Sequence, residues 1–337
     1  MKEKQVVLTG VKPTGMPHLG NYLGAIKPAV DMANASSADA ESWLFIADYH
    51  SLTALLKPQE LNHMIYEVAA SWLACGLDPN KSVIYRQSDI PELMELNWIL
   101  SCLCPKGLMN RAHAYKARVQ ENQELQREDL DFGVSMGLYN YPVLMSADIL
   151  MFDASHVPVG ADQVQHIEIA RDLAEKFNRH YGDVLTLPKA IVGDESRTVP
   201  GIDGRKMSKS YDNHIPLFDP AKKRRKRVMK IVTDSSPPEA PKNPEDSLLF
   251  DLYKLFASES QIAEMTKKYQ AGIGWGYVKE DLNTVLEEIF APMREKYEYY
   301  MNDLNELDRI LNAGAEKARP KASEKIKKIR KAIGLVR

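Results

Sequence analysis

A glycine-containing segment near the start of the chain has the character of an anion-binding loop. An apolar run at residues 5–9 leads into Gly10, Gly15 and Gly20, and apolar residues at helical spacing follow. Backbone amides at a helix N-terminus, together with the helix dipole, favour a negatively charged ligand. The glycine spacing fits neither a dinucleotide-binding fingerprint nor a P-loop. The pattern therefore indicates a phosphate site, and on spacing alone an ordinary strand-to-helix turn is an equal alternative.

A second segment could stabilise charge on phosphate groups. Residues 204–210 read Gly-Arg-Lys-Met-Ser-Lys-Ser, so Lys206 and Lys209 lie three residues apart with serines beside them. The glycines and prolines of residues 190–211 predict a mobile loop rather than a helix or strand. On such a loop the two lysines could close over a triphosphate and stabilise a departing pyrophosphate. Taken alone, a solvated charge run is the favoured alternative, because Lys/Ser clusters are common on surfaces.

Residues 139–150 combine one carboxylate with an apolar helix face. We expect a helix that begins at Pro142, with Tyr141, Met145 and Asp148 at i, i+4 and i+7 on one face. Burial of a carboxylate is expensive unless a donor meets it, so a ligand N–H is one candidate partner. An Asp that pairs with a nearby Arg or a backbone amide is an equal alternative.

The elements that must position these residues follow the pattern of a parallel sheet wrapped by helices. Apolar runs predict strands at residues 5–9, 42–47, 82–86 and 155–159, and helices are predicted to open near Asn21, Pro58, Pro91 and Asp162. After residue 215 the strand signals fade and helical periodicity continues to the end. We therefore expect a Rossmann-like α/β catalytic domain at residues 1–215 and an all-helical domain at residues 216–337.

Composition limits the class of protein. A chain of 337 residues with 44% hydrophobic side chains can bury a sizeable core. The 44 basic and 46 acidic side chains nearly cancel, so a nucleic-acid surface must come from local clusters such as residues 222–227. No apolar stretch is long enough to span a bilayer, and we expect a cytoplasmic protein. Cys75, Cys102 and Cys104 lack metal-site spacing and are interpreted as reduced core thiols, so no metal site is expected.

Two of these segments together resemble the signature motifs of class I aminoacyl-tRNA synthetases. Residues 17–21, Pro-His-Leu-Gly-Asn, are similar to the His-Ile-Gly-His motif with Asn21 in place of the second His, and residues 206–210 match Lys-Met-Ser-Lys-Ser letter for letter. Residues 139–150 and 157–166 resemble the tryptophan-specific branch of the family, in which the Asp accepts the indole N–H. The helical part resembles the anticodon-binding half of that branch, so the resemblance covers essentially the whole chain.

The resemblance implies ATP-dependent activation of L-tryptophan, with Mg²⁺ balancing the phosphates, and transfer of tryptophan to tRNA(Trp) by a homodimer. It implies that the residues acting on the reacting phosphate are His18, Asn21, Lys116, Lys206 and Lys209. It implies that ATP contacts Lys12, Pro13, Gly20, Asn21, Gly160, Asp162, Lys206, Met207, Ser208 and Lys209. It implies that tryptophan contacts Leu8, His50, Tyr141, Met145, Asp148, Ile149, Val157, Val159 and Gln163. Relatives often carry Gln at the place of Lys12, so its contact with ATP stays open.

Three other functions share part of this pattern. A tyrosine-specific ligase has the same fold and motifs, but generally carries Gln at the place of Met145. A nucleotidylyltransferase shares the logic of the first motif and does not require a helical second domain. A non-catalytic RNA-binding paralogue would be expected to lose Lys206 or Asp148, and both are present.

Overall fold

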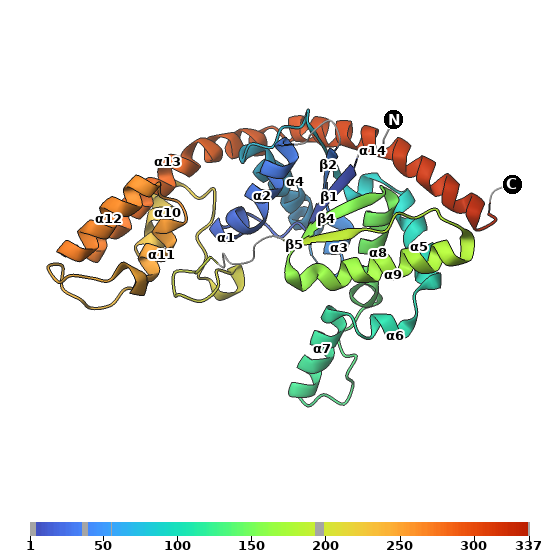
Figure 1. Ribbon diagram of the computed structural model, residues 1–337, viewed down its shortest axis with the longest axis horizontal. Helices are drawn as coiled ribbons and strands as arrows, with labels where there is room; N and C mark the ends of the chain where they lie inside the picture. The colour runs from blue at the N-terminus through green and yellow to red at the C-terminus, as the bar shows by residue number, and fades with distance from the viewer. Residues whose placement is uncertain (1–4, 36–39, 55, 193–198, 336–337) are drawn as a thin grey trace.

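A parallel sheet forms the centre of the molecule (Figure 1). The computed structural model describes residues 5–35, 40–54, 56–192 and 199–335, and within these residues five strands pair in the order β3-β2-β1-β4-β5. The strands are β1 (Gln5–Val11), β2 (Ala40–Ile46), β3 (Ser82–Arg86), β4 (Ala154–Val159) and β5 (Lys189–Val192). The chain runs from β1 to β2 and β3 on one side and then returns to β4 on the other. In open α/β sheets such a reversal, here between β1 and β4, is where ligands generally bind, at the carboxyl ends of the strands.

The four predicted strands are confirmed, with ends that differ by at most two residues. The register pairs Gln5 with Ala40 along β1 and β2, and Ser42 with Ser82 along β2 and β3. Side chains alternate between the faces. In β2 the residues from Ser42 to Ile46 are buried on both faces, whereas β1 buries Val6 and Leu8 on one face and leaves Val7 and Val11 partly buried on the other, as expected for a sheet covered by helices on each face. The predicted Rossmann-like α/β fold is therefore correct.

Helices cover both faces of the sheet and continue to the C-terminus. In the first half they are α1 (Leu19–Asn21), η1 (Tyr22–Ile26), α2 (Lys27–Asn34), α3 (Asp48–Ser51), α4 (Pro58–Ala74), η2 (Gln87–Asp89), α5 (Glu92–Leu103), α6 (Lys106–Met109), α7 (His113–Glu124) and α8 (Met136–Met151). The later ones are η3 (Ala161–Gln163), α9 (Val164–Tyr181), η4 (Lys209–Tyr211), α10 (Ala221–Val228), η5 (Pro244–Asp246), α11 (Leu248–Lys254), α12 (Glu259–Ala271), α13 (Trp275–Asn302) and α14 (Leu304–Ala332).

Two apolar clusters lie on opposite faces of the sheet. The first joins Leu44 and Ile46 of β2 to α2, α4 and the helices after residue 215. The second joins Val6 and Leu8 of β1 to α5, α8 and α9. Each face therefore buries its own helical layer, and the helices fix where the carboxyl ends of the strands lie.

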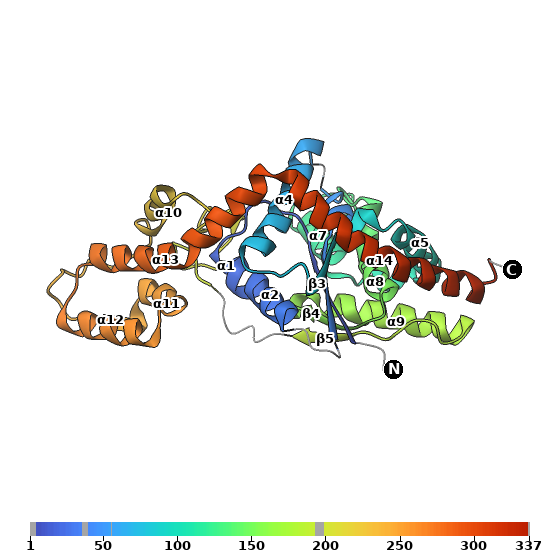
Figure 2. The same cartoon turned by 90° about the horizontal axis from the view of Figure 1, so that it is seen from above.

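The last helix, α14, closes the β3 edge of the sheet. Its first turns pack into the first cluster through Leu307 and Leu311, and later turns pack into the second through Ala315 and Ala318. Figure 2 shows α14 crossing over the strands at β3. The crossing is so close that a Cβ at Gly314 would lie 1.8 Å from the carbonyl oxygen of Ile84. An edge strand that would otherwise expose unpaired backbone is covered in this way.

The outlying helices extend the molecule in two directions. Helices α10 to α12 lie at one end of the molecule, and α13 runs from that end back to α4, where Tyr297 donates to Glu67 (Figure 1). Helix α7 with its following loop projects from the body on the side of α6 (Figure 1). Among the described residues, none of the helices is both long and apolar enough to cross a membrane. The division into domains at residue 215 stays a prediction. Helix α14, although it comes after that residue, packs on the sheet.

Two expectations about individual elements were wrong. Lys189–Val192 forms β5, which pairs with β4, although residues 190–211 were expected to lack regular structure. This short edge strand is partly exposed along its length, so no burial pattern marks it in the sequence. Helix α8 begins at Met136 rather than Pro142, because the Oγ of Ser135 accepts the backbone N–H of Leu138 and caps an earlier turn. Pro142 lies inside the helix, and residues 193–198 of the expected loop lie outside the described residues.

The three cysteines are free thiols, but they are not all core residues. Cys75 and Cys104 are partly buried, whereas Cys102 is exposed. Cys102 lies on the outer side of α5, two residues from the buried Leu100, so the expectation of a core thiol is wrong at this position.

Gly314 gives a direct test of the α14 crossing. Gly314→Ala should lower stability by about 1–3 kcal/mol, because the added Cβ would force α14 away from the β3 backbone. Gly276→Ala is the matched control: Gly276 is also helical, in α13, with open space at its Cβ, and the change should be neutral or stabilise by up to about 1 kcal/mol. Thermal unfolding of both variants measures the difference, and equal midpoints would contradict the close crossing.

Candidate active site

His18 and Asn21 cap the first helix through each other. The Nδ1 of His18 accepts the backbone N–H of Asn21 at 3.2 Å, and the Oδ1 of Asn21 accepts the backbone N–H of His18 at 3.1 Å. This reciprocal pair is a capping box that satisfies two donors at the helix end. Each side chain uses its acceptor atom for a hydrogen bond from a backbone N–H. The Nε2–H of His18 and the side-chain NH₂ of Asn21 therefore remain available as donors.

The imidazole of His18 is held in its neutral form. Burial, with smaller contributions from the nearby His214 and Lys209, lowers its pKa to about 4. The ring centroids of His18 and His214 are 5.9 Å apart. With Nδ1 accepting a backbone hydrogen bond, the proton of neutral His18 must sit on Nε2. The site thus presents a neutral N–H donor at the N-terminus of α1.

Lys209 reaches the glycine-containing segment across nearly the whole catalytic part of the chain. Its Nζ donates to the carbonyl oxygens of Thr14 at 2.8 Å and Gly15 at 3.0 Å. Gly15 has φ of 84°, a conformation that favours glycine. Burial lowers the pKa of Lys209, and the carboxylate of Glu67 opposes that shift. The structure therefore brings the two motifs together at one place.

Asn213 holds the segment around Lys206–Ser210 in shape. Its Oδ1 accepts the backbone N–H of Ser208 at 2.8 Å, and its Nδ2 donates to Asp203 at 2.7 Å and to the Lys206 carbonyl at 3.1 Å. Arg227 of α10 donates to both the carbonyl and the carboxylate of Asp212. The sequence did not single out Asn213, because a side chain that supports a loop has no motif of its own. Arg227 was noted only as part of the basic run at residues 222–227, and its contact with Asp212 was not predicted.

At the other side of the crevice, Asp148 is a buried carboxylate with two partners. It is 1% exposed, its Oδ2 lies 2.9 Å from the Nε2 of His50, and the Nε2 of Gln87 donates to both carboxylate oxygens at 2.7 and 3.0 Å. Burial raises the pKa of Asp148, while the contacts with His50 and Gln87 oppose that shift. Within the described part of the chain, neither the Arg nor the backbone partner considered from the sequence is found among its hydrogen bonds.

Gln87 also helps to join the segments that follow β2 and β3, a contact that was not predicted from the sequence. The Oε1 of Gln87 accepts the backbone N–H of Tyr49 at 3.1 Å, next to the buried Asp48. Asp48 in turn accepts the backbone N–H of Ser88 at 3.0 Å and its hydroxyl. Both segments directly follow strands β2 and β3, so their position at the carboxyl edge of the sheet was the signal that could have found them.

Tyr141 and His166 extend the polar part of this site. The hydroxyl of Tyr141 lies 2.8 Å from the Nε2 of His166, and the Tyr141 ring stands edge-on to His50 with centroids 6.2 Å apart. Burial lowers the pKa of His166 to about 4, so this ring is also neutral near pH 7. His166 was not predicted as a site residue.

The apolar residues predicted for the amino-acid side share one cluster. Leu8, Ile149 and Val157 are buried members of the cluster on the α8 face of the sheet, and Met145 and Val159 are partly buried against it. They therefore border the same region as Asp148.

On the nucleotide side, the predicted residues divide into buried and exposed ones. Pro13 and Met207 are buried, and a Cβ at Gly20 would lie 3.0 Å from the ring of His18. Lys206 and Gly160 are exposed, and Lys12 donates to the hydroxyl of Thr53 at 3.1 Å. Lys206 and Gly160 are therefore accessible to a ligand, whereas the amine of Lys12 is already bonded to Thr53.

Two residues predicted to contact ligands are hydrogen-bonded to each other. The Nε2 of Gln163 donates to the carboxylate of Asp162 at 2.9 Å, in the short helix η3 after β4. Ser208 also has a local role, because its hydroxyl accepts the backbone N–H of Ser210. A ligand at these positions would replace contacts within the chain.

Lys116 is not brought to the rest of the site. It lies exposed on α7, which projects from the body well away from α1 (Figure 1). There it lines a surface pocket of about 620 Å³ with residues of the same helix and Asn110. Among the described residues, no group of three His, Cys, Asp or Glu side chains is arranged to hold a metal ion.

The basic run at residues 222–227 is mostly neutralised within the chain. Lys223 pairs with Asp219, Arg225 with Glu280 and Arg227 with Asp212, while Arg224 is fully buried against Glu287. Four of the six charges therefore support α10 and its neighbours. This leaves Lys222 and Lys226 as the members of the run for which no such pair is found.

The state of His18 can be measured directly. In nuclear magnetic resonance titrations its ring should remain neutral, with the proton on Nε2, until the pH approaches 4. The unfolded chain would take up this proton near pH 6.5, so the contribution of neutral His18 to stability should fall as the pH drops from 6.5 toward 4. A titration midpoint near 6.5, or a proton on Nδ1, would contradict the capping geometry.

Comparison with known proteins identifies the family. The family described as tRNA synthetases class I (W and Y) matches residues 1–291 of the chain. A tryptophan--tRNA ligase of Neisseria meningitidis is 52% identical over 332 residues, which cover 98% of each chain. The tryptophan--tRNA ligase of Pseudomonas aeruginosa is 49% identical over 332 residues, covering 98% of this chain and 73% of the relative.

Solved structures agree with this similarity. The tryptophanyl-tRNA synthetase of Campylobacter jejuni, complexed with ADP and tryptophan, has a TM-score of 0.90 and 45% identity, with 98% of this chain and 100% of that chain covered. A tyrosyl-tRNA synthetase of Archaeoglobus fulgidus has a TM-score of 0.60 at 17% identity, over 88% of this chain and 91% of that chain, and shares the fold alone. The chain belongs to the family of class I tRNA synthetases (W and Y).

Proposed function

We propose that this protein activates L-tryptophan with ATP and transfers it to tRNA(Trp). The observation that carries the proposal is the contact of Lys209 with the Thr14–Gly15 turn beside His18, because it joins two separate phosphate-binding segments at one point. The tryptophan--tRNA ligases at about 50% identity over nearly the whole chain support the same conclusion.

In the first step the tryptophan carboxylate attacks the α-phosphorus of ATP. An oxygen–phosphorus bond forms, the bond from the α-phosphorus to the bridging oxygen breaks, and pyrophosphate leaves with tryptophanyl-AMP as the product. The reaction requires positioning and charge stabilisation rather than a protein nucleophile. In this proposal His18 donates through Nε2–H and Asn21 through its amide, while Lys206 and Lys209 stabilise the pyrophosphate. Lys116 could join them only if α7 moved toward the site.

Mg²⁺ is proposed to arrive with the phosphates of ATP. Magnesium in such sites is commonly bound through substrate phosphates and water rather than by an all-protein cage. The lack of a three-ligand acidic cluster among the described residues agrees with that mode. In this proposal the donor roles of His18 and the lysines do not depend on the metal ion.

In the second step a 3′-terminal ribose hydroxyl of tRNA attacks the carbonyl carbon of the adenylate, and AMP leaves. Residues 216–337 are proposed to bind the anticodon part of the tRNA. Within the basic run, Lys222 and Lys226 are the proposed phosphate contacts, because phosphate attraction requires cations that are not already paired. The other four basic residues of this run support the protein itself.

Tryptophan is proposed to bind between the apolar cluster and Asp148. Val157, Val159 and Met145 would pack on the indole, and Asp148 would accept the indole N–H while Gln87 and His50 hold the carboxylate. Leu8, Ile149 and Tyr141 would complete the wall of the pocket. Gln163 would meet the polar end of the amino acid. Met145 in place of Gln disfavours the tyrosine-specific alternative.

The remaining nucleotide contacts are proposed on the loop after β4 and the turn after β1. Gly160 and Asp162 would contact adenosine, since they follow a strand at the ligand-binding edge of the sheet. Pro13, Gly20, Met207 and Ser208 would form the backbone lining. Lys12 can reach ATP only by leaving Thr53.

We propose that helix α7 and the loop after it contact a second copy of the chain. Four apolar side chains after α7 are each at least 40% exposed: Leu125, Leu130 and Phe132 in the loop, and Met136 at the start of α8. Apolar side chains gathered on one projecting segment are characteristic of interaction surfaces. Light scattering tests this proposal, since a dimer would have twice the 38.1 kDa mass of the chain.

The function is tested by exchange of labelled pyrophosphate into ATP. Exchange should depend on tryptophan and not on tyrosine. Lys209→Ala should lower kcat by about 10²–10³, because one transition-state donor is lost, with a smaller change in the KM for tryptophan. Lys27→Ala removes a surface lysine of α2 that pairs with Asp31 and should leave the rate unchanged. An unchanged kcat in Lys209→Ala would contradict the assigned role.

Asp148 offers a test of specificity. Asp148→Ala should weaken tryptophan activation and reduce the preference for tryptophan over phenylalanine. A site built on a buried polar group can prefer the ligand that pairs with that group by as much as about 10⁴-fold. The measured quantity is the ratio of kcat/KM for the two amino acids on the same preparation, so loss of folded protein cancels. If both values fall by one factor, Asp148 supports the fold and does not read the indole.

A further inference from the structure

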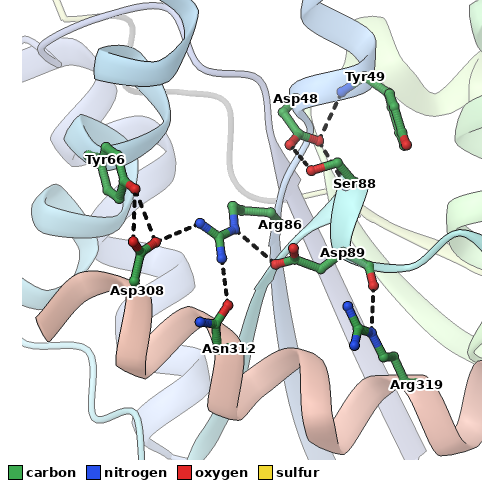
Figure 3. Close-up of polar contacts among 9 residues, drawn as sticks. All are labelled: Asp48, Tyr49, Tyr66, Arg86, Ser88, Asp89, Asp308, Asn312 and Arg319. Carbon is green, nitrogen blue, oxygen red and sulfur yellow. Dashed lines mark hydrogen bonds and ion pairs between the residues drawn. The ribbon is translucent and has the colours of Figure 1, made fainter. Parts of the chain in front are cut away.

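We propose that the C-terminal helix α14 positions the amino-acid site by holding the turn at residues 86–89 at both ends. This inference rests on the proposed function, because the turn carries Gln87 to Asp148. The residues on α14 that make the contacts are Asp308, Asn312 and Arg319, and we call them the α14 clamp (Figure 3). None of them touches the site directly, so their role would be positioning.

The first end of the turn is held through Arg86. Its Nη1 donates to Asp308 at 2.7 Å and its Nη2 to Asn312 at 2.6 Å, while its Nε donates to Asp89 at 2.9 Å. The guanidinium therefore uses all three of its nitrogens in a fixed planar arrangement. Tyr66 of α4 donates to both carboxylate oxygens of Asp308, which fixes the acceptor as well (Figure 3).

The other end is held through the backbone. The Nε of Arg319 donates to the carbonyl oxygen of Asp89 at 2.9 Å. Between the two anchor points, Gly314 brings α14 against the backbone of Ile84, so the helix cannot slide away from β3 without breaking these contacts. The turn is therefore tied to one rigid element at its first and last residues.

The two residues between these anchors face the buried carboxylates of the site. Gln87 donates to Asp148, and Ser88 donates to Asp48 through its backbone N–H and hydroxyl. The turn is a single short helix, η2, with no side-chain cap of its own. Contacts from outside therefore hold the turn, and in this proposal the α14 clamp sets the position of Gln87 together with the bonds to Tyr49 and Asp48. Hydrogen bonds weaken steeply with distance and angle, so a small displacement would loosen the Gln87–Asp148 pair.

The experiment measures pyrophosphate exchange for Arg86→Ala and for the milder Asn312→Ala, which removes a single acceptor. Both should raise the KM for tryptophan, by about 3- to 30-fold for Arg86→Ala and less for Asn312→Ala, with kcat and the KM for ATP nearly unchanged. Arg330→Ala is the matched control, since Arg330 also joins α14 to the catalytic part, at Glu95, but does not touch the turn. It should lower thermal stability without changing the KM for tryptophan.

A double-mutant cycle decides whether the clamp acts through Gln87. In a Gln87→Ala background, Arg86→Ala should have little further effect on the KM for tryptophan, because the group that it positions is gone. Additive effects, or equal KM values for the Arg86, Asn312 and Arg330 variants, would overturn the inference. The proposed function fails separately, if the unchanged protein shows no tryptophan-dependent exchange.

Discussion

The burial of one carboxylate, Asp148, requires hydrogen-bond donors that several other elements of the catalytic part must supply. A charge taken out of water must be met by donors, or its pKa rises until it is neutral. Here the donors come from two other parts of the chain, His50 in α3 and Gln87 in η2. Both follow strands whose carboxyl ends lie side by side, so the order β3-β2-β1-β4-β5 is what makes the meeting possible. The same sheet carries the apolar cluster that contains Leu8, Ile149 and Val157 on its α8 face.

The proposed phosphate site depends on a different physical arrangement. Backbone amides satisfy the side-chain acceptors of His18 and Asn21, so that the donors of the same side chains can serve a ligand. Burial keeps His18 neutral, so it can donate without adding a fixed charge beside Lys209. Such prepared donors need little rearrangement during reaction.

The helical part does more than extend the molecule. Arg227 of α10 supports the segment after Lys209, and α14 supports the turn that carries Gln87. Each half of the crevice is thus steadied by a helix from beyond residue 215. The pairing of most of the basic run on α10 shows why a count of charges in sequence overstates the surface available to RNA.

The sequence by itself determined the four long strands, the place of both signature segments and the helical face that carries Asp148, because these follow from local periodicity and from residues in fixed order. Only the tertiary structure decided which groups meet Asp148, where α8 begins, and that Lys189–Val192 is a strand. Gln87 and Arg86 matter through partners far away in the chain, Asp148 and Asp308, and Asn213 matters through the fold of its own loop. A single glutamine or arginine has no local signature for such a contact, since packing of the strands and helices brings the partners together.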